Sequence, residues 1–214
     1  MTTQQITSKD KIMLAARKLF GAHGYAETTI KKVSEEAGVA FGLIPHYFGS
    51  KEKLFVAASL SVLDDIFERL GTGKGDSPNG LVAVMRFVER YLSCSVDPDM
   101  HFMILVRCSP YSDIKLDINK DDIIFRFEQL IAELAQRIER GVEDGSVMPC
   151  EPKKMADVIF ATIVGAVRTQ LLTPYCPLNF YEAMIQSMYR SIEKVPGHTL
   201  YEFQLPPGAL CPRY

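Results

Sequence analysis

Residues 28–54 read TTIKKVSEEAGVAFGLIPHYFGSKEKL, and this stretch decides the fold of the N-terminal part of the chain. A helix is predicted to begin after Thr28 and Thr29, which are both good N-cap residues, and to end at Gly38, which can adopt a positive φ. A second, short helix is predicted over 40–48, with Val39 filling the angle between the two helices. This order and spacing are typical of a helix-turn-helix motif, whose second helix can enter the major groove of DNA.

The flanking segments predict two longer helices around this motif. Apolar residues recur at helical spacing over 8–23, with Ser8 as the predicted N-cap and Gly24 as the predicted stop. Ser50 is the predicted N-cap of the next helix, which should run to about Leu70.

The rest of the chain is also predicted to be helical. The segment GTGKGDSPNG at 71–80 is the clearest break, because it contains four glycines and a proline. Helical patterns then recur over about 81–95, 99–109, 119–144, 152–172 and 178–194. No strand-length alternation of period two is present, so we expect an all-α chain of about nine helices, a three-helix head on a larger helical body. The predicted domains are 1–55, 56–194 and a proline-rich tail, 195–214.

The composition excludes several classes of protein. The chain has 214 residues, 47% hydrophobic and 23% charged, which excludes disordered, collagen-like and fibrous chains. The net charge of −2 means that any nucleic-acid binding must use a local patch. Residues 1–60 hold eight Lys or Arg against five Asp or Glu, whereas the remainder holds sixteen against twenty-one. A basic head on an acidic body favours a DNA reader with a separate partner module.

The sequence lacks the usual patterns of a signal peptide, a membrane span and a cysteine metal site, and this predicts its localisation and cofactors. The N-terminal residues lack the apolar segment of a signal peptide, and the longest apolar run, 158–167, is half of a membrane span. We therefore expect a cytoplasmic protein with no membrane contact. The widely spaced cysteines contain no CxxC pair, which favours reduced thiols and predicts neither a metal site nor a cofactor. They are Cys94, Cys108, Cys150, Cys176 and Cys211.

The head contains a dense set of family-typical residues: Leu19, Phe20, Gly24, Tyr25, Thr28, Thr29, Ile30, Val33, Ala37, Gly38, Val39, Gly42, His46, Tyr47, Phe48, Lys51 and Leu54. On these residues the chain resembles the TetR family of bacterial transcriptional repressors. The resemblance covers about residues 9–58. It implies a homodimer that binds a double-stranded DNA operator through the head and a small-molecule effector, of unknown identity, through the body, which releases the operator.

The resemblance also implies which residues touch DNA. Two residues precede the turn, most belong to the recognition helix, and the last two match phosphate-binding positions: Thr29, Lys31, Ala40, Phe41, Gly42, Leu43, Pro45, His46, Tyr47 and Lys51. Two of them depart from the family pattern. Ala40 lacks the usual capping hydroxyl, and Pro45 removes an N–H, so we expect a shortened or bent recognition helix. Base reading would then depend on His46, Lys31 and apolar contact with thymine methyls through Phe41 or Leu43.

Two further sets of residues are predicted in the body. An effector pocket would be lined by Phe87, Tyr91, His101, Met103, Arg107, Tyr111, Phe125, Phe160 and Arg168. A buried arginine needs a partner, which an anionic ligand could supply, although each arginine could also pair with an acid of the chain. Small and apolar residues of the last two helices predict a dimer interface: Ala161, Gly165, Thr169, Phe180, Met184 and Met188.

Two other functions remain to be compared with the sequence pattern. A regulator of the same fold could respond to a protein partner or to oxidation of Cys94 or Cys108 instead of a small ligand. An enzyme is disfavoured, because the histidines are scattered at positions 23, 46, 101 and 198 and no GxSxG, HExxH, P-loop or GxGxxG motif is present.

Overall fold

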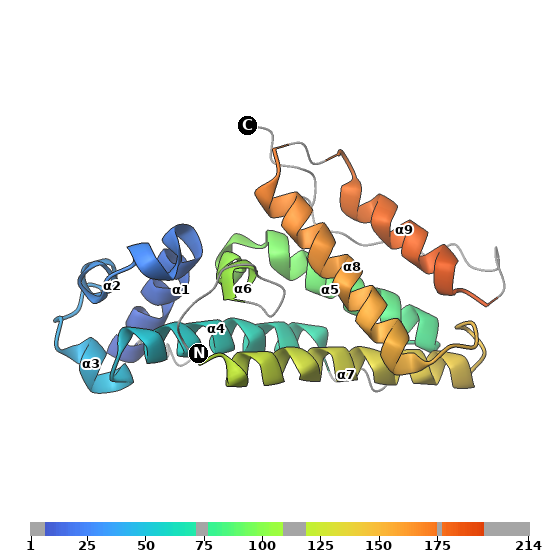
Figure 1. The fold of residues 1–214 in the computed structure, drawn as a ribbon, viewed down its shortest axis with the longest axis horizontal. Helices are drawn as coiled ribbons and strands as arrows, with labels where there is room; N and C mark the ends of the chain where they lie inside the picture. Colours follow the sequence, from blue (N-terminus) through green and yellow to red (C-terminus); the bar gives the residue numbers. More distant parts are fainter. Residues whose placement is uncertain (1–6, 72–76, 109–118, 175–176, 195–214) are drawn as a thin grey trace, which may run out of the picture. The chain divides into compact units, whose positions relative to one another are not determined.

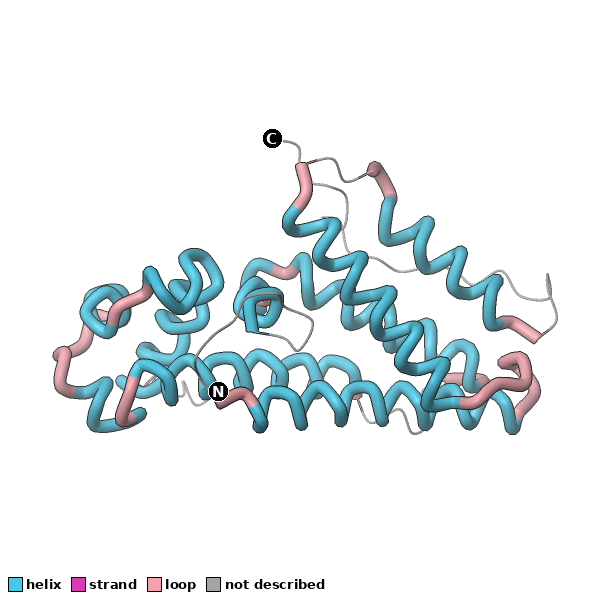
Figure 2. The backbone as a smooth tube through the Cα atoms, viewed as in Figure 1, coloured by secondary structure: helices cyan, strands magenta, loops and turns pink. Residues whose placement is uncertain are grey.

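The computed structural model describes residues 7–71, 77–108, 119–174 and 177–194, and helices dominate these residues (Figures 1 and 2). The helices are α1 (Ser8–Glu27), α2 (Ile30–Ala37), α3 (Leu43–Phe48), α4 (Lys51–Leu70), α5 (Gly80–Val96), η1 (Pro98–Met100, a 3-10 turn), α6 (Met103–Cys108), α7 (Asp121–Glu143), α8 (Pro152–Leu172) and α9 (Phe180–Ile192). No strand is present in this part of the chain, only an isolated bridge between Val147 and Glu193. The all-α prediction is confirmed.

Two predicted helix limits differ from the structure. The predicted helix over 99–109 is divided into η1 and α6, because His101 between them has a φ of 51°. The N-cap of α1 is Thr7 rather than Ser8. The Asp10 amide donates to Thr7 Oγ1, and the Thr7 amide donates to Asp10 Oδ2 at 3.0 Å. This reciprocal capping box satisfies two amides that Ser8 and Lys11 could not.

The chain divides into two compact units. The first contains Met1–Asp65 and Asp99–Arg126, and the second contains Ile66–Pro98 and Phe127–Tyr214. The predicted functional boundary at residue 55 remains a proposal, and the predicted tail lies outside the described residues.

The first unit is organised around an aromatic cluster. The ring centroid of Phe55 lies 5.0 Å from that of Phe20 and 5.2 Å from that of Tyr25, in edge-to-face arrangements. Such pairs stabilise a core beyond the area that they bury. Further buried apolar residues join α1, α2, α3 and the first part of α4: Ile12, Ala16, Val33, Ile44, Leu54 and Ala58.

A glycine kink divides α1 near its end. Gly24 has φ 78° and ψ 177°, a conformation in which a side chain is strained. The buried Thr28 hydroxyl donates to the Gly24 carbonyl at 2.8 Å, which holds the chain after the kink. The prediction that Gly24 interrupts the helix through a positive φ is therefore confirmed, although one more helical turn follows Gly24.

The second unit contains a very close crossing of α5 and α7. A Cβ atom added to Gly80 would lie 2.1 Å from the Gly141 nitrogen and 2.2 Å from the Gly141 Cα. The N-terminus of α5 is capped from the segment after α7, because the Gly80 amide donates to Asp144 Oδ2 at 2.7 Å and the Leu81 amide donates to Ser146 Oγ at 3.0 Å. Gly80, which reads as loop in the sequence, is thus a packing residue.

Asp144→Asn is expected to lose about 1 kcal/mol of unfolding free energy at pH 7, because a carboxylate caps α5 better than an amide does. Burial raises the pKa of Asp144, but hydrogen bonds from Ser146 and Gly80 outweigh it, so the pKa is lowered overall. The stabilisation is therefore present above the carboxyl's ordinary pKa of about 3.9 and lost as the pH falls through the lower folded value. Urea unfolding from pH 7 to pH 3 should show the two proteins converging; a constant difference would contradict this cause.

One described helix is long and apolar enough to cross a membrane by composition alone, namely α8. Ile159, Phe160, Ile163 and Val167 of this helix are buried within the protein. Val158 and Leu172 of the same helix are exposed, so packing within one chain accounts for only part of its hydropathy.

Candidate nucleic-acid interface

The helix-turn-helix begins with a well-capped α2. The Lys32 amide donates to the Thr29 hydroxyl at 3.2 Å, as expected for the predicted N-cap. Gly38 ends α2 with a φ of 62°, and its amide donates to the Glu35 carbonyl at 3.2 Å. A left-handed residue at this position reverses the chain without the cost that a Cβ would bring.

The recognition helix is shorter than predicted. Residues 40–42 form a turn, in which the Leu43 amide donates to the Ala40 carbonyl at 3.0 Å, and α3 covers only Leu43–Phe48. Neither Ala40 nor Gly42 supplies a capping side chain, so the helix begins late. Pro45 lies in the first turn, where a missing N–H leaves no intrahelical bond unmade. The expected shortening is confirmed.

The predicted DNA-contacting residues lie mostly on the surface of the first unit. In α3, Ile44 alone is buried and anchors the helix on the core. Leu43 and Lys51 are half-buried. The others are exposed: Thr29, Lys31, Ala40, Phe41, Gly42, Pro45, His46 and Tyr47. The structure thus presents α3 outward, with lysines nearby in sequence on α2 and α4.

Lys51 is held in place by the end of α1. Its Nζ lies 4.3 Å from the centroid of the Tyr25 ring and donates to the Ala26 carbonyl at 3.3 Å. Burial lowers the pKa of Lys51 and raises the pKa of Tyr25, and the nearby Glu52 carboxylate adds to the rise at Tyr25. The cation therefore sits at a fixed place near the N-terminus of α4, where a DNA phosphate would find it preorganised.

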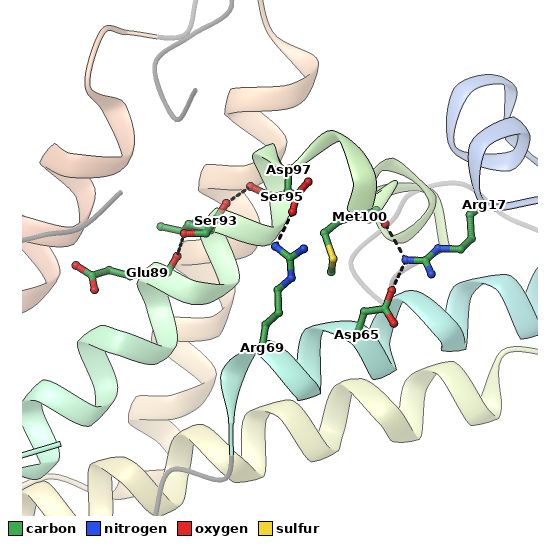
Figure 3. A network of polar contacts seen from close by, with 9 residues as sticks. Arg17, Asp65, Arg69, Glu89, Ser93, Ser95, Asp97 and Met100 are labelled. Carbon is green, nitrogen blue, oxygen red and sulfur yellow. Dashed lines mark hydrogen bonds and ion pairs between the residues drawn. The ribbon is translucent and has the colours of Figure 1, made fainter. Parts of the chain in front are cut away.

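Two arginines tie α1 to the segment 99–108, and sequence reasoning missed both contacts. Arg107, which we predicted for an effector pocket, donates from Nε to the Gly21 carbonyl at 2.9 Å and from Nη2 to the Ala22 carbonyl at 3.2 Å. Arg17 donates to Asp65 Oδ2 at 2.5 Å and to the Met100 carbonyl at 3.2 Å (Figure 3). The bonds to backbone carbonyls cross more than 80 residues of sequence and the Arg17–Asp65 bond crosses 48, and no local pattern signals them.

The other predicted pocket residues divide between the two units. In the first unit, His101 and Met103 are half-buried and Phe125 is 60% exposed. In the second, Phe87 is buried, and the Tyr91 and Phe160 rings are 5.5 Å apart. Arg168 is half-buried in α8. Tyr111 lies outside the described residues.

The predicted dimer residues differ in exposure. Ala161 and Gly165 are exposed on α8, and Thr169 is half-buried. On α9, Phe180 and Met184 are half-buried, whereas Met188 is 7% exposed within one chain. Among all residues that the structure describes, no three His, Cys, Asp or Glu side chains gather to hold a metal ion.

Known proteins resemble this chain at two levels, one that covers the helix-turn-helix and one that covers most of the chain. Residues 12–58, which contain the helix-turn-helix, match the family model for bacterial regulatory proteins of the tetR family. The HTH-type transcriptional repressor AcnR of Corynebacterium glutamicum is 27% identical over 175 residues, spanning 78% of this chain and 82% of AcnR.

Solved structures resemble the whole fold. A putative transcriptional regulator from Saccharomonospora viridis, in complex with choline, has a TM-score of 0.74 at 18% identity, over 88% of this chain and 98% of that one. The regulator FadR from Bacillus subtilis, in complex with stearoyl-CoA, has a TM-score of 0.70 at 19% identity, over 84% of this chain and 94% of that one. At these identities the likeness establishes the fold alone.

Proposed function

Because residues 12–58 place this chain in the TetR family of bacterial transcriptional regulators, we propose that it represses transcription from a palindromic operator and leaves the DNA when a small molecule binds. The observation that carries the proposal is the surface of α3, on which Pro45, His46 and Tyr47 are exposed while Ile44 is buried, with lysines nearby in sequence on α2 and α4. A short exposed helix fits a major groove about 12 Å wide, and lysines neutralise phosphates. We propose a cytoplasmic location, because the proposed target is bacterial DNA.

The test is a selection of bound fragments from sheared genomic DNA, using the purified full-length protein at near-physiological salt. Enrichment of one palindromic site is the expected result. Equal recovery of all sequences, with an affinity that falls steeply with salt, would indicate only non-specific binding and overturn the proposal.

Homodimerisation would use an exposed stripe on α8. Val158, Ala161, Gly165 and Leu172 are all exposed and recur at intervals of three, four and seven residues, so they share one face of the helix. A Cβ added to Gly165 would meet nothing within 4 Å in one chain. Small residues on an open apolar stripe allow a second copy of the same helix to approach closely, in a self-complementary interface.

Ala161→Glu is expected to convert the dimer to a monomer and to weaken operator binding at least tenfold. The introduced carboxylate would be desolvated opposite its own symmetry mate, while the monomer fold has room for it. Ala132→Glu, an equally exposed site on α7, is the matched control. Sedimentation velocity gives the mass; an A161E protein that stays dimeric would remove α8 from the interface.

The effector is proposed to bind in the helical body. The choline and stearoyl-CoA complexes of proteins with this fold show that it accommodates ligands of opposite charge. The interior of the second unit carries polar groups, because Glu89, Arg137 and Gln170 are at most 7% exposed. Both compounds are therefore the first probes to add to the operator complex, and release of DNA by either would support effector control.

Control by thiol oxidation is disfavoured by the placement of the cysteines. Cys94 and Cys108 are both fully buried, and burial raises the pKa of the Cys108 thiol to about 11 against a hydrogen bond with Ser59. The Cys108 thiol therefore holds almost no thiolate at neutral pH.

We expect iodoacetamide at pH 7.5 to modify the half-buried Cys150 at least tenfold faster than Cys94 or Cys108 in the folded protein. Mass spectrometry of the digested peptides measures each site, and urea-unfolded protein, in which all three should react alike, is the control. Rapid modification of Cys108 in the folded protein would restore the thiol-controlled alternative.

A further inference from the structure

The surface that faces DNA in the proposed function is unusually poor in hydrogen-bonding groups. Between Gly38 and Ser50 the sequence contains no Arg, Lys, Asn, Gln, Asp or Glu. These six residue types make the common bidentate contacts to guanine, adenine and cytosine edges in the major groove. Among the exposed side chains of this segment, His46 and Tyr47 alone can hydrogen-bond with a base.

The same surface exposes large apolar groups instead. Phe41, two residues before α3, is 57% exposed, and Tyr47 within the helix is 43% exposed. Pro45, in the first turn of α3, is exposed as well and offers neither a donor nor a side-chain acceptor. Phe41 does not belong to the buried core, whereas Ile44 of α3 does.

The basic groups near this surface in sequence are each engaged by other groups of the chain. Lys51 is fixed by the Tyr25 ring and the Ala26 carbonyl near the start of α4. Lys32 donates to the Glu27 carbonyl at 2.9 Å, and Lys31 lies 3.9 Å from a Glu35 carboxylate oxygen on the same helix. An apolar surface flanked in sequence by lysines is suited to the major groove of DNA, because thymine methyl groups lie on the floor of this groove and phosphates lie on both sides of it.

The major groove offers one apolar feature, the C5 methyl group of thymine. We infer that this protein, given the DNA-binding function proposed above, recognises its operator chiefly through thymine methyls packed against Phe41. His46 is the principal hydrogen-bonding reader of that surface. Sequence specificity then comes from the position of methyl groups in each half-site, and the lysines supply affinity that does not depend on sequence.

The test uses two random-sequence duplex libraries, one synthesised with thymine and the other with uracil, which lacks only the C5 methyl. Both are selected on the full-length wild-type protein at the same salt concentration. The thymine library should yield a palindromic motif with thymine at defined positions. The same motif carrying uracil at those positions should bind about tenfold more weakly, because one buried methyl is lost in each half-site.

Two variants test whether Phe41 causes the preference for thymine over uracil. In Phe41→Ala, the ratio of thymine to uracil affinity should fall to about one, whereas Leu14→Ala, a head residue of nearly equal exposure (58%), should keep the wild-type ratio. Thermal unfolding should be unchanged in both, since both side chains are exposed.

The outcomes separate the inference from the function on which it rests. A motif that binds equally with thymine and uracil, or a Phe41→Ala protein that keeps the ratio, overturns the inference and leaves the repressor proposal standing. If neither library enriches any motif, the repressor proposal is overturned, and the inference with it.

Discussion

Gly80→Ala is expected to leave the second unit unable to pack, with a loss of at least 3 kcal/mol of unfolding free energy. The added Cβ would lie 2.1 Å from the Gly141 nitrogen and 2.8 Å from the Arg140 carbonyl carbon, and these are backbone atoms that cannot rotate away. Separating α5 from α7 would also break the bonds from the Gly80 and Leu81 amides to the segment after α7.

Urea unfolding followed by circular dichroism measures this loss. Gly141→Ala should be nearly as damaging, because its Cβ would meet Val147 Cγ2 at 2.4 Å. Gly42→Ala, at a glycine with φ −65° and with nothing within 4 Å of the added Cβ, should leave the stability nearly unchanged. Equal midpoints for all three variants would show that the α5–α7 crossing tolerates a methyl group.

Gly24→Ala is expected to cost about 1–3 kcal/mol and to weaken operator binding at least tenfold. The cost arises because φ 78° with ψ 177° is a conformation almost restricted to glycine. A Cβ there would also lie 3.4 Å from Arg107 Nη1, whose guanidinium bonds the carbonyls just before the kink. Relaxing the kink would shift Tyr25, and with it the ring that holds Lys51.

Urea unfolding measures the loss of stability, and fluorescence anisotropy with the selected operator measures the loss of affinity. Ala26→Ser, an exposed substitution two residues later, is the control and should match the wild type in both. A Gly24→Ala protein of lowered stability but unchanged affinity would show that the kink serves folding without positioning Lys51.

The helical framework was predictable because its signals are local. Periodic apolar residues, the Thr29 cap and the left-handed Gly38 each act within one or two turns, and the structure confirms all of them. Errors arose where two local options compete. Thr7, not Ser8, is the N-cap because Asp10 accepts a hydrogen bond from the Thr7 amide in return. The α3 helix begins at Leu43 because Ala40 has no side-chain oxygen that could cap an earlier start.

Long-range contacts could not be predicted in the same way. Gly80 ends a glycine-rich segment and reads as loop, and only the approach of Gly141, 61 positions away, gives it a packing role. Arg107 reads as a candidate ligand partner in an apolar run, yet it bonds backbone carbonyls of α1. A side chain's partners depend on the fold, and one sequence carries no direct record of them.

The separation of buried and exposed residues around α3 has a consequence for the evolution of such a protein. Ile44 is buried in the core, whereas Phe41, His46 and Tyr47 are exposed. Substitutions at such sites usually change stability by no more than about 0.5 kcal/mol. Target choice and foldability are thus governed by separate residues, so a duplicated copy can acquire a different binding site through a few surface exchanges without first losing its fold.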